Sequence, residues 1–208
     1  MHNTRIFRSL LPLRTENTIM ALTLTIAAPG SSNAAGASFA TPLQMLGECH
    51  RRVERQCGTL ARLVPHLAAN GSDAAAREAA SAVLRYFDLA GPNHHADEEE
   101  DLFPALLESM AGSDAVCLRE LTESLAADHR EFERRWAALR RTLLEVAEGR
   151  AALLDAADVQ GYADLYKQHI AREEGELLPM ASRLLGDAEI ERIALAMQRR
   201  RGLLPGAA

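Results

Sequence analysis

Four histidines, each with a glutamate four residues further on, are the side chains of this sequence whose types and spacing most clearly suggest chemistry. Within a helix, residues i and i+4 share a face, because 3.6 residues per turn leave an offset of only about 40°. Imidazole nitrogen and carboxylate oxygen together suit iron, manganese or zinc. The pairs are His50 and Glu54, His94 and Glu98, His129 and Glu133, and His169 and Glu173. We therefore predict a metal site built from several histidines and carboxylates.

The positions of these histidines along the chain predict that they converge. The midpoints between successive histidines fall within residues 70–73, 111–114 and 149–151, three segments with turn chemistry. Each residue adds about 1.5 Å to a helix, so histidines equally far from a turn reach the same depth where the chain folds back. Short turns between long helices give antiparallel neighbours. All four imidazoles are thus expected at one level of an up-down-up-down four-helix bundle.

The sequence also contains an internal repeat. Residues 94–104 align without gaps with residues 169–179, and residues 50–55 align with residues 129–134. Each half of the repeat therefore contains one single histidine and one His-x-x-x-Glu segment. We expect the bundle to be a duplicated helical hairpin, with the first and second helices related to the third and fourth.

The repeat decides between two adjacent histidines. It aligns His169 with His94, whereas His95 is turned about 100° away around the helix. We therefore expect His94 to be the inner ligand and His95 to lie at the edge of the site. Of the other histidines, His2 lies in the N-terminal tail and His66 lies on another face from His50, so neither is expected to bind metal.

Composition limits the fold class and the partners. A chain of 208 residues with 48% hydrophobic but only 4% aromatic residues, rich in Ala, Leu, Glu and Arg, is typical of an all-α domain. The net charge of -6 argues against a nucleic-acid partner, because phosphate binding favours a basic surface. No run of 18 apolar residues occurs, so we expect no membrane-spanning helix.

Three regions are expected along the chain. Residues 1–40 lack helical periodicity and are predicted to be a disordered or loosely packed tail. Residues 41–185 are predicted to form the bundle, with Gly91-Pro92 kinking or splitting its second helix. Residues 186–208 are predicted to hold a short fifth helix and a tail. The arginines at 199–201 are expected to oppose the dipole of that helix rather than form a binding patch.

The cysteines indicate a reducing compartment. Cys49, Cys57 and Cys117 have neither CxxC spacing nor an even count, so reduced, buried or partly buried thiols and a cytoplasmic location are expected. Export is the alternative, because N-terminal arginines precede an apolar stretch at residues 19–28 that loosely mimics an export signal. The sequence identifies no protein partner.

The number of ligands favours two metal ions over one. Four histidines and at least two carboxylates exceed the four ligands of tetrahedral zinc, and a carboxylate can bridge two ions. Glu98 and Glu173, which the repeat aligns, have the strongest case. Glu54 and Glu133 stay open between metal ligation and ion pairs with neighbouring arginines. Solvated or supporting roles are expected for the other nearby acids, which are Glu99, Glu100, Asp101, Glu174 and Glu176.

Apolar and aromatic residues are expected beside the metals. The residues seven positions from each histidine, toward the same end of the bundle, should form one layer: Cys57, Phe87, Trp136 and Tyr162. A dry pocket in this layer would admit a small neutral diatomic gas such as dioxygen or nitric oxide, and it would exclude bulky polar substrates.

These residues resemble the hemerythrin family, in particular the bacterial HHE cation-binding domains with the pattern His, His-x-x-x-Glu, His, His-x-x-x-Glu. The similarity spans about residues 43–185, and the segments ending in Leu-Phe-Pro and Leu-Leu-Pro are its most specific part. It implies a non-haem centre of two irons, with an oxo or hydroxo bridge as an option, that reacts reversibly with dioxygen or nitric oxide. The implied terminal ligands are His50, His94, His129 and His169, and the implied bridging ligands are Glu98 and Glu173.

One position departs from the oxygen-carrying hemerythrins. Those proteins have a second histidine on the third helix, where this chain has Glu133. An altered iron ligand would change oxygen binding and could favour oxidation of the iron. The resemblance therefore favours sensing, iron handling, detoxification or a role like the di-iron iron-sulfur-cluster repair proteins over simple oxygen transport.

Three functions are consistent with this sequence. We favour a di-iron binding protein that responds to dioxygen, nitric oxide or redox state over an enzyme. The second is a di-iron oxidase or peroxidase; no acidic residue stands three positions before any of the four histidines, which lowers the case for a ferritin-like site with its Glu-x-x-His pairs. The third is an interaction protein in which the metal only stabilises the fold.

Overall fold

The computed structural model describes residues 41–110 and 114–204. Within these residues every regular element is a helix and there is no strand, which confirms the predicted all-α class. The predicted N-terminal tail, residues 1–40, lies outside the described residues. No helix in the described part of the chain is both long and apolar enough to cross a membrane.

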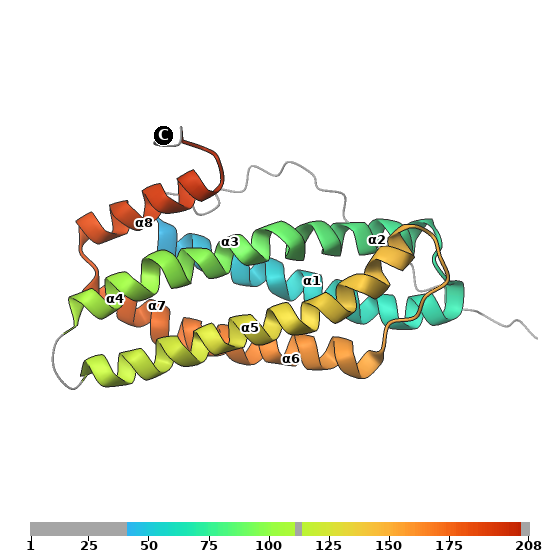
Figure 1. Cartoon of the computed structure of the whole chain (residues 1–208), viewed down its shortest axis with the longest axis horizontal. Helices are drawn as coiled ribbons and strands as arrows, with labels where there is room; N and C mark the ends of the chain where they lie inside the picture. The colour runs from blue at the N-terminus through green and yellow to red at the C-terminus, as the bar shows by residue number, and fades with distance from the viewer. Residues whose placement is uncertain (1–40, 111–113, 205–208) are drawn as a thin grey trace, which may run out of the picture.

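Four long helical segments lie side by side, and a short helix lies against one end of them (Figure 1). The first and third are α1 (Pro42–Asn70) and α5 (Asp114–Ala147). The second is composite, with the parts α2 (Ala74–Arg85), η1 (Tyr86–Ala90), α3 (Gly91–Ala96), η2 (Asp97–Leu102) and α4 (Phe103–Ser109). The fourth has the parts α6 (Ala156–Arg172), η3 (Glu173–Leu177) and α7 (Leu178–Leu184). The predicted fifth helix is α8 (Asp187–Arg200).

Local sequence signals set two of the turns between these segments. Asp73 caps α2 by accepting a hydrogen bond from the Ala76 amide, and Asp155 caps α6 in the same way. Gly71 and Gly149 have φ angles of 65° and 78°, a left-handed conformation that favours glycine. Both turns therefore fall where the sequence places them, and successive helices pack against each other.

The Gly91-Pro92 pair does not split the second segment. Each π-helical segment, η1, η2 and η3, ends directly before an X-Pro pair, and the amide of the residue that follows each segment donates to the carbonyl five residues earlier. A proline lacks the amide that a regular helix needs, and the wider π turn lets the chain pass it and stay helical. The Leu-x-Pro endings of the repeated segments thus mark two of the three places where the helix changes its winding.

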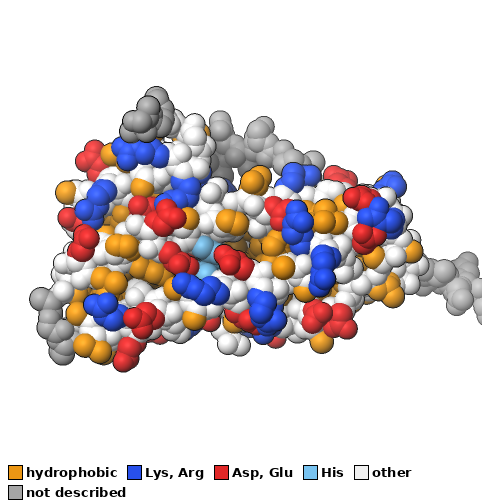
Figure 2. Space-filling view, viewed as in Figure 1, with side chains coloured by type: hydrophobic (Ala, Val, Ile, Leu, Met, Phe, Trp, Pro, Cys, Tyr) orange, Lys and Arg blue, Asp and Glu red, His pale blue; other side chains and the backbone are white. Residues whose placement is uncertain are grey.

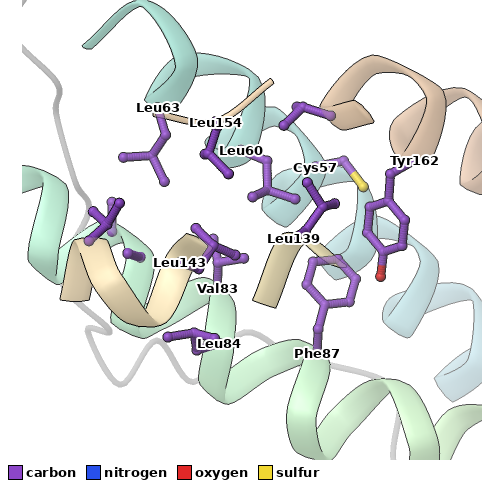
Figure 3. Packing of buried hydrophobic residues seen from close by; sticks show 14 of the residues in the cluster. Cys57, Leu60, Leu63, Val83, Leu84, Phe87, Leu139, Leu143, Leu154 and Tyr162 are labelled. Atoms are coloured by element: carbon purple, nitrogen blue, oxygen red, sulfur yellow. The ribbon is translucent and has the colours of Figure 1, made fainter. Parts of the chain in front are cut away.

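The hydrophobic core is divided into two clusters. One includes Leu60, Leu63, Val83 and Leu143, whose side chains point toward one another from three helices (Figure 3). The other includes Leu46, Leu102, Leu106 and Leu125, together with Ile193 and Met197 of α8. Helix α8 is therefore packed into the core at one end of the molecule and is not a loose extension.

Candidate metal centre

The four imidazoles predicted to converge do so. They come from four different segments: His50 from α1, His94 from α3, His129 from α5 and His169 from α6. Each of these side chains is buried, with 1% to 3% of its surface exposed. The Nε2 atoms of His129 and His169 are 3.2 Å apart, and the ring centroids of His50 and His94 are 5.1 Å apart.

Two fully buried carboxylates lie among these rings. The oxygens of Glu173 are 3.0 Å from His50 Nε2 and 2.9 Å from His169 Nε2. The oxygens of Glu98 are 3.3 Å from His94 Nε2 and 3.4 Å from His129 Nε2. Each carboxylate therefore spans two imidazoles that come from different helical segments.

The six side chains form two overlapping groups. In each group four possible ligand atoms lie within 4.8 Å of one another. Glu98 and Glu173 belong to both groups; His50 and His94 complete one, and His129 and His169 complete the other. Each group could hold a metal ion, and the two groups have both carboxylates in common.

The buried polar atoms of these groups fit a cation. Both oxygens of Glu98 and of Glu173 have no partner with hydrogen-bond geometry, and the same holds for Nε2 of His50. Buried polar groups left in this state are costly, and a buried charge is costlier still, unless a metal ion or an ion pair compensates them. A cation bound between the imidazoles would satisfy these atoms together.

A second set of carboxylates orients the rings from behind. Nδ1 of His50 lies 3.0 Å from Glu174, Nδ1 of His129 lies 2.7 Å from Glu99, and Nδ1 of His169 lies 3.2 Å from Asp128. A carboxylate on Nδ1 fixes the ring so that Nε2 faces inward, and it makes the ring a stronger ligand. Of the four converging histidines, His94 is the exception, since its buried Nδ1 has no hydrogen-bond partner.

The supporting acids were only partly predictable. Glu99 and Glu174 directly follow the two buried glutamates, and the sequence left them open between solvated and supporting roles. Asp128 was missed. It stands beside His129 in the sequence but bonds to His169 across the helix interface and also pairs with Arg172. No spacing rule within one helix could have indicated that contact.

Two predicted carboxylates lie apart from the ligand groups. Glu54 and Glu133 are both exposed, and neither belongs to either group. The sequence left both open, and the structure does not bring them together with the other six side chains. His66, which was not expected to bind metal, lies elsewhere and bonds to Asp73 at 3.0 Å.

His95 is placed differently from its prediction. It was expected at the edge of the site, but it is 91% buried and its ring stacks on that of His129, with centroids 4.0 Å apart and planes 9° apart. Its Nε2 is also buried without a hydrogen-bond partner. The helical offset turns His95 away from both groups of possible ligands, but the neighbouring helix α5 covers its side chain.

The two shared carboxylates differ in their electrostatics. Burial, together with the nearby charge of Glu173, raises the pKa of Glu98 well above its ordinary value. Burial acts in the same direction on Glu173, but contacts with the imidazoles of His169 and His50 outweigh it and hold the pKa of Glu173 well below its ordinary value. Without metal, the pair therefore carries its negative charge on Glu173.

The imidazoles are also shifted. Burial lowers the pKa of His94 to about 3, so this ring is neutral at physiological pH. Burial opposes protonation of His50 as well, but the contact with Glu173 outweighs it and raises the pKa of His50. A neutral imidazole is the form that binds metal.

A small cavity lies beside the His129 half of the centre. It has a volume of about 50 Å³, and its walls include His95, Phe132, Glu133, Trp136 and Tyr166. The ring centroids of Phe87, Trp136 and Tyr162 lie within 6.2 Å of one another, which confirms the three aromatic members of the predicted layer. On the face in Figure 2, histidine surface is visible in a shallow hollow between acidic side chains.

The fold and the two ligand groups define a helical protein that could hold metal ions between its helices. The family model described as hemerythrin HHE cation binding domain matches residues 41–181. The chain therefore belongs to the hemerythrin family. An uncharacterized protein of Haemophilus influenzae is 32% identical to it over 138 residues, which cover 66% of this chain and 77% of that protein.

Proposed function

We propose that this protein binds two iron ions in its candidate centre and responds to dioxygen, nitric oxide or redox state. The observation that carries the proposal is the pair of four-ligand groups that share Glu98 and Glu173. Shared carboxylates are suited to two neighbouring ions, and mixed nitrogen and oxygen ligands suit iron. When bound, the ions would supply the binding of the gas and the change of oxidation state.

Each part of the chain has a separate task in this proposal. The inner nitrogens of the four histidines hold the ions, and the carboxylates of Glu99, Asp128 and Glu174 keep three of the rings in place. The two apolar clusters flank the centre and keep water out. The scaffold we propose is the up-down-up-down four-helix bundle, formed by a duplicated hairpin over residues 41–185, with residues 186–208 added to it.

The cavity supports a small ligand. One water molecule needs roughly 10–15 Å³ of cavity volume, so this cavity of about 50 Å³ holds only a few atoms. A diatomic gas fits, whereas an organic substrate does not. The cavity reaches the ligand His129 through the ring of His95, which both lines the cavity and stacks on His129.

One observation favours the oxidase or peroxidase alternative. Glu133 is exposed and lines the cavity, so a carboxylate stands beside the path of the small ligand. Such a group can accept or deliver a proton during turnover. Consumption of peroxide by the iron-loaded protein, lost on Glu133→Gln with the iron content intact, would favour the enzyme over the binding protein.

Metal analysis with an anaerobic gas titration tests the main proposal. We expect two iron ions per chain and a near-ultraviolet absorption change on exposure to dioxygen or nitric oxide. His94→Ala and Glu98→Ala should reduce the iron content, whereas the matched control His66→Ala should leave it intact. Equal iron loss in all three variants, or a spectrum that ignores both gases, would contradict the proposal.

A further inference from the structure

Two arginines at the end of α8 form ion pairs with η2, the π-helical turn that carries Glu98. Arg200 pairs with Asp97 and lies 2.8 Å from both Glu100 and Asp101. Arg201 forms two contacts with Asp97, at 3.0 Å and 2.5 Å. Asp97 directly precedes Glu98 in η2, and Glu100 and Asp101 lie two and three residues after it, so these contacts lie on both sides of the residue that presents a shared carboxylate.

The ion pairs with Asp97 are largely removed from water, whereas Glu100 is 68% exposed. Asp97 is fully buried, and Arg200 and Arg201 expose only 15% and 19% of their side chains. An exposed ion pair contributes little, but breaking a buried one leaves a charge without compensation. The planar guanidinium groups also fix the orientation of the carboxylate they bind, because each offers several donors in a rigid fork. The contact is therefore suited to holding η2 in one position relative to α8.

Helix α8 brings these arginines from outside the matched family domain. The family match ends at residue 181, whereas α8 begins at Asp187. The helix buries Ile193 and Met197 in the same apolar cluster as Leu102, the last residue of η2. Apolar packing thus sets the helix beside η2, and the arginines reach the acids from there.

The π-helical turn that carries Glu173, η3, lacks this support. Among the ion pairs of the described residues, the acids of η3 pair with imidazoles and with no arginine. Glu173 is fixed by its two close imidazole contacts at 2.9 Å and 3.0 Å, whereas the imidazole contacts of Glu98 are longer, at 3.3 Å and 3.4 Å. Glu98 is thus the shared ligand that depends more on what holds its backbone.

We propose that Arg200 and Arg201 are positioning residues for the metal centre: by holding η2 through Asp97, α8 controls how firmly Glu98 grips both ions. The inference rests on the proposed metal site, but only on its ability to bind a divalent ion. Because Glu98 belongs to both ligand groups, loosening η2 affects both positions. The latch formed by Arg200, Arg201 and Asp97 sets the rate at which metal leaves.

The test compares metal loss from the cobalt(II)-loaded full-length protein and from its variants. In Arg200→Ala/Arg201→Ala we expect at least tenfold faster transfer of cobalt to a chelator and a changed visible spectrum of the bound ion. Arg200→Lys/Arg201→Lys keeps the charge without the fork, so it should recover part of the effect. Arg192→Ala is the matched control on the same helix, since Arg192 and its partner Glu108 are both exposed.

The outcomes separate this inference from the proposed function. If the unmodified protein takes up no cobalt, the metal site itself is wrong and the latch falls with it. If the unmodified protein binds cobalt, and the double alanine variant releases it at the same rate with the same spectrum, the latch alone is overturned. Hydrogen exchange of α8 and η2 checks the loss of contact, and the lysine variant serves if the alanine variant does not fold.

Discussion

The two His-x-x-x-Glu segments share a sequence pattern and a backbone but differ in their surroundings. In both, the histidine lies in the last turn of an α-helix, the glutamate lies in the π-helical turn that follows, and a proline comes soon afterwards. In the first segment, arginines at the end of α8 pair with Asp97, the residue before Glu98. In the second, Glu173 is held by direct imidazole contacts.

This difference gives two chemically identical carboxylates different states. Glu173 has two close imidazoles and keeps its charge, whereas Glu98 lies farther from its imidazoles and favours the protonated form. Metal binding by Glu98, as proposed, would then release its proton, because a carboxylate binds metal only after it has lost its proton. The environment of each glutamate, and not its motif, decides its state in the absence of metal.

The largest expected effect is a loss of stability of the metal-free protein when Glu173, but not Glu98, is replaced. Glu173→Gln removes the charged partner of buried His50 and should lower the free energy of unfolding by about 3 kcal/mol. Glu98→Gln replaces a protonated acid with a neutral amide of similar shape, so it should not lower the free energy of unfolding and should raise it at neutral pH, where the Glu98 carboxyl of the unfolded chain is ionised. Urea denaturation with a chelator at neutral pH measures both. Equal losses would show that the two carboxylates have the same charge.

The second prediction concerns pH. A carboxyl with a lowered pKa in the folded state stabilises the protein above its unfolded pKa, and that contribution is lost as pH falls. The stabilising effect of Glu173 should therefore decrease as pH falls below about 4.5, the ordinary value. A carboxyl with a raised pKa behaves oppositely, so Glu98 should become destabilising as pH rises above about 4.5.

Unfolding curves of the metal-free protein across this pH range check the two signs. The free energy of unfolding of Glu98→Gln relative to that of the unmodified protein should increase with pH. The amount by which Glu173→Gln is less stable than the unmodified protein should decrease as pH falls. A Glu98→Gln variant whose relative stability ignores pH would contradict the assignment of the proton to Glu98.

The third prediction concerns a substitution that makes the first His-x-x-x-Glu segment more like the second. The repeat places Ile170 where the first segment has His95, and both side chains are buried. His95→Ile loses a ring stack worth roughly 0.5–1.5 kcal/mol, but it removes a buried nitrogen without a partner, which costs roughly 1–3 kcal/mol. We expect a metal-free protein that is about 1 kcal/mol more stable and that keeps its metal content. A clear loss of stability would show that His95 has a partner in the cavity.

The smallest effects are expected for the glutamates of the other two His-x-x-x-Glu pairs. Glu54→Ala and Glu133→Ala change exposed side chains outside both ligand groups, so iron content should be unchanged and stability should shift by no more than about 0.5 kcal/mol. Metal analysis and thermal unfolding check this. Loss of iron in Glu133→Ala would restore Glu133 as a ligand.

Four pairs with identical spacing could not be told apart from spacing alone. Glu54 and Glu133 continue a regular α-helix, and their side chains turn out to solvent. At Glu98 and Glu173 the helix changes to π winding between the histidine and the glutamate, which alters the direction of the fourth residue. Turn chemistry and equal spacing were enough to predict where the imidazoles meet, because the depth of each imidazole depends on helix length. The change of winding was not predictable from a uniform period of 3.6.

The roles of His95 and α8 were hidden for a related reason. Both depend on contacts between segments far apart in the chain, such as the stack of His95 on His129 and the grip of Arg200 on Asp97. The arginines at 199–201 were expected only to oppose the dipole of their own helix. Periodicity describes one helix at a time, so it could not show which neighbouring helix would receive them.

The position of Trp136 gives the protein a built-in optical reporter. It is the single tryptophan of the chain, it lines the cavity beside the centre, and its indole nitrogen donates a hydrogen bond to Asp88 at 2.9 Å. Intrinsic fluorescence at the tryptophan band therefore comes from one known place. The arrival of a quencher at that wall can be followed by stopped flow without attaching any dye.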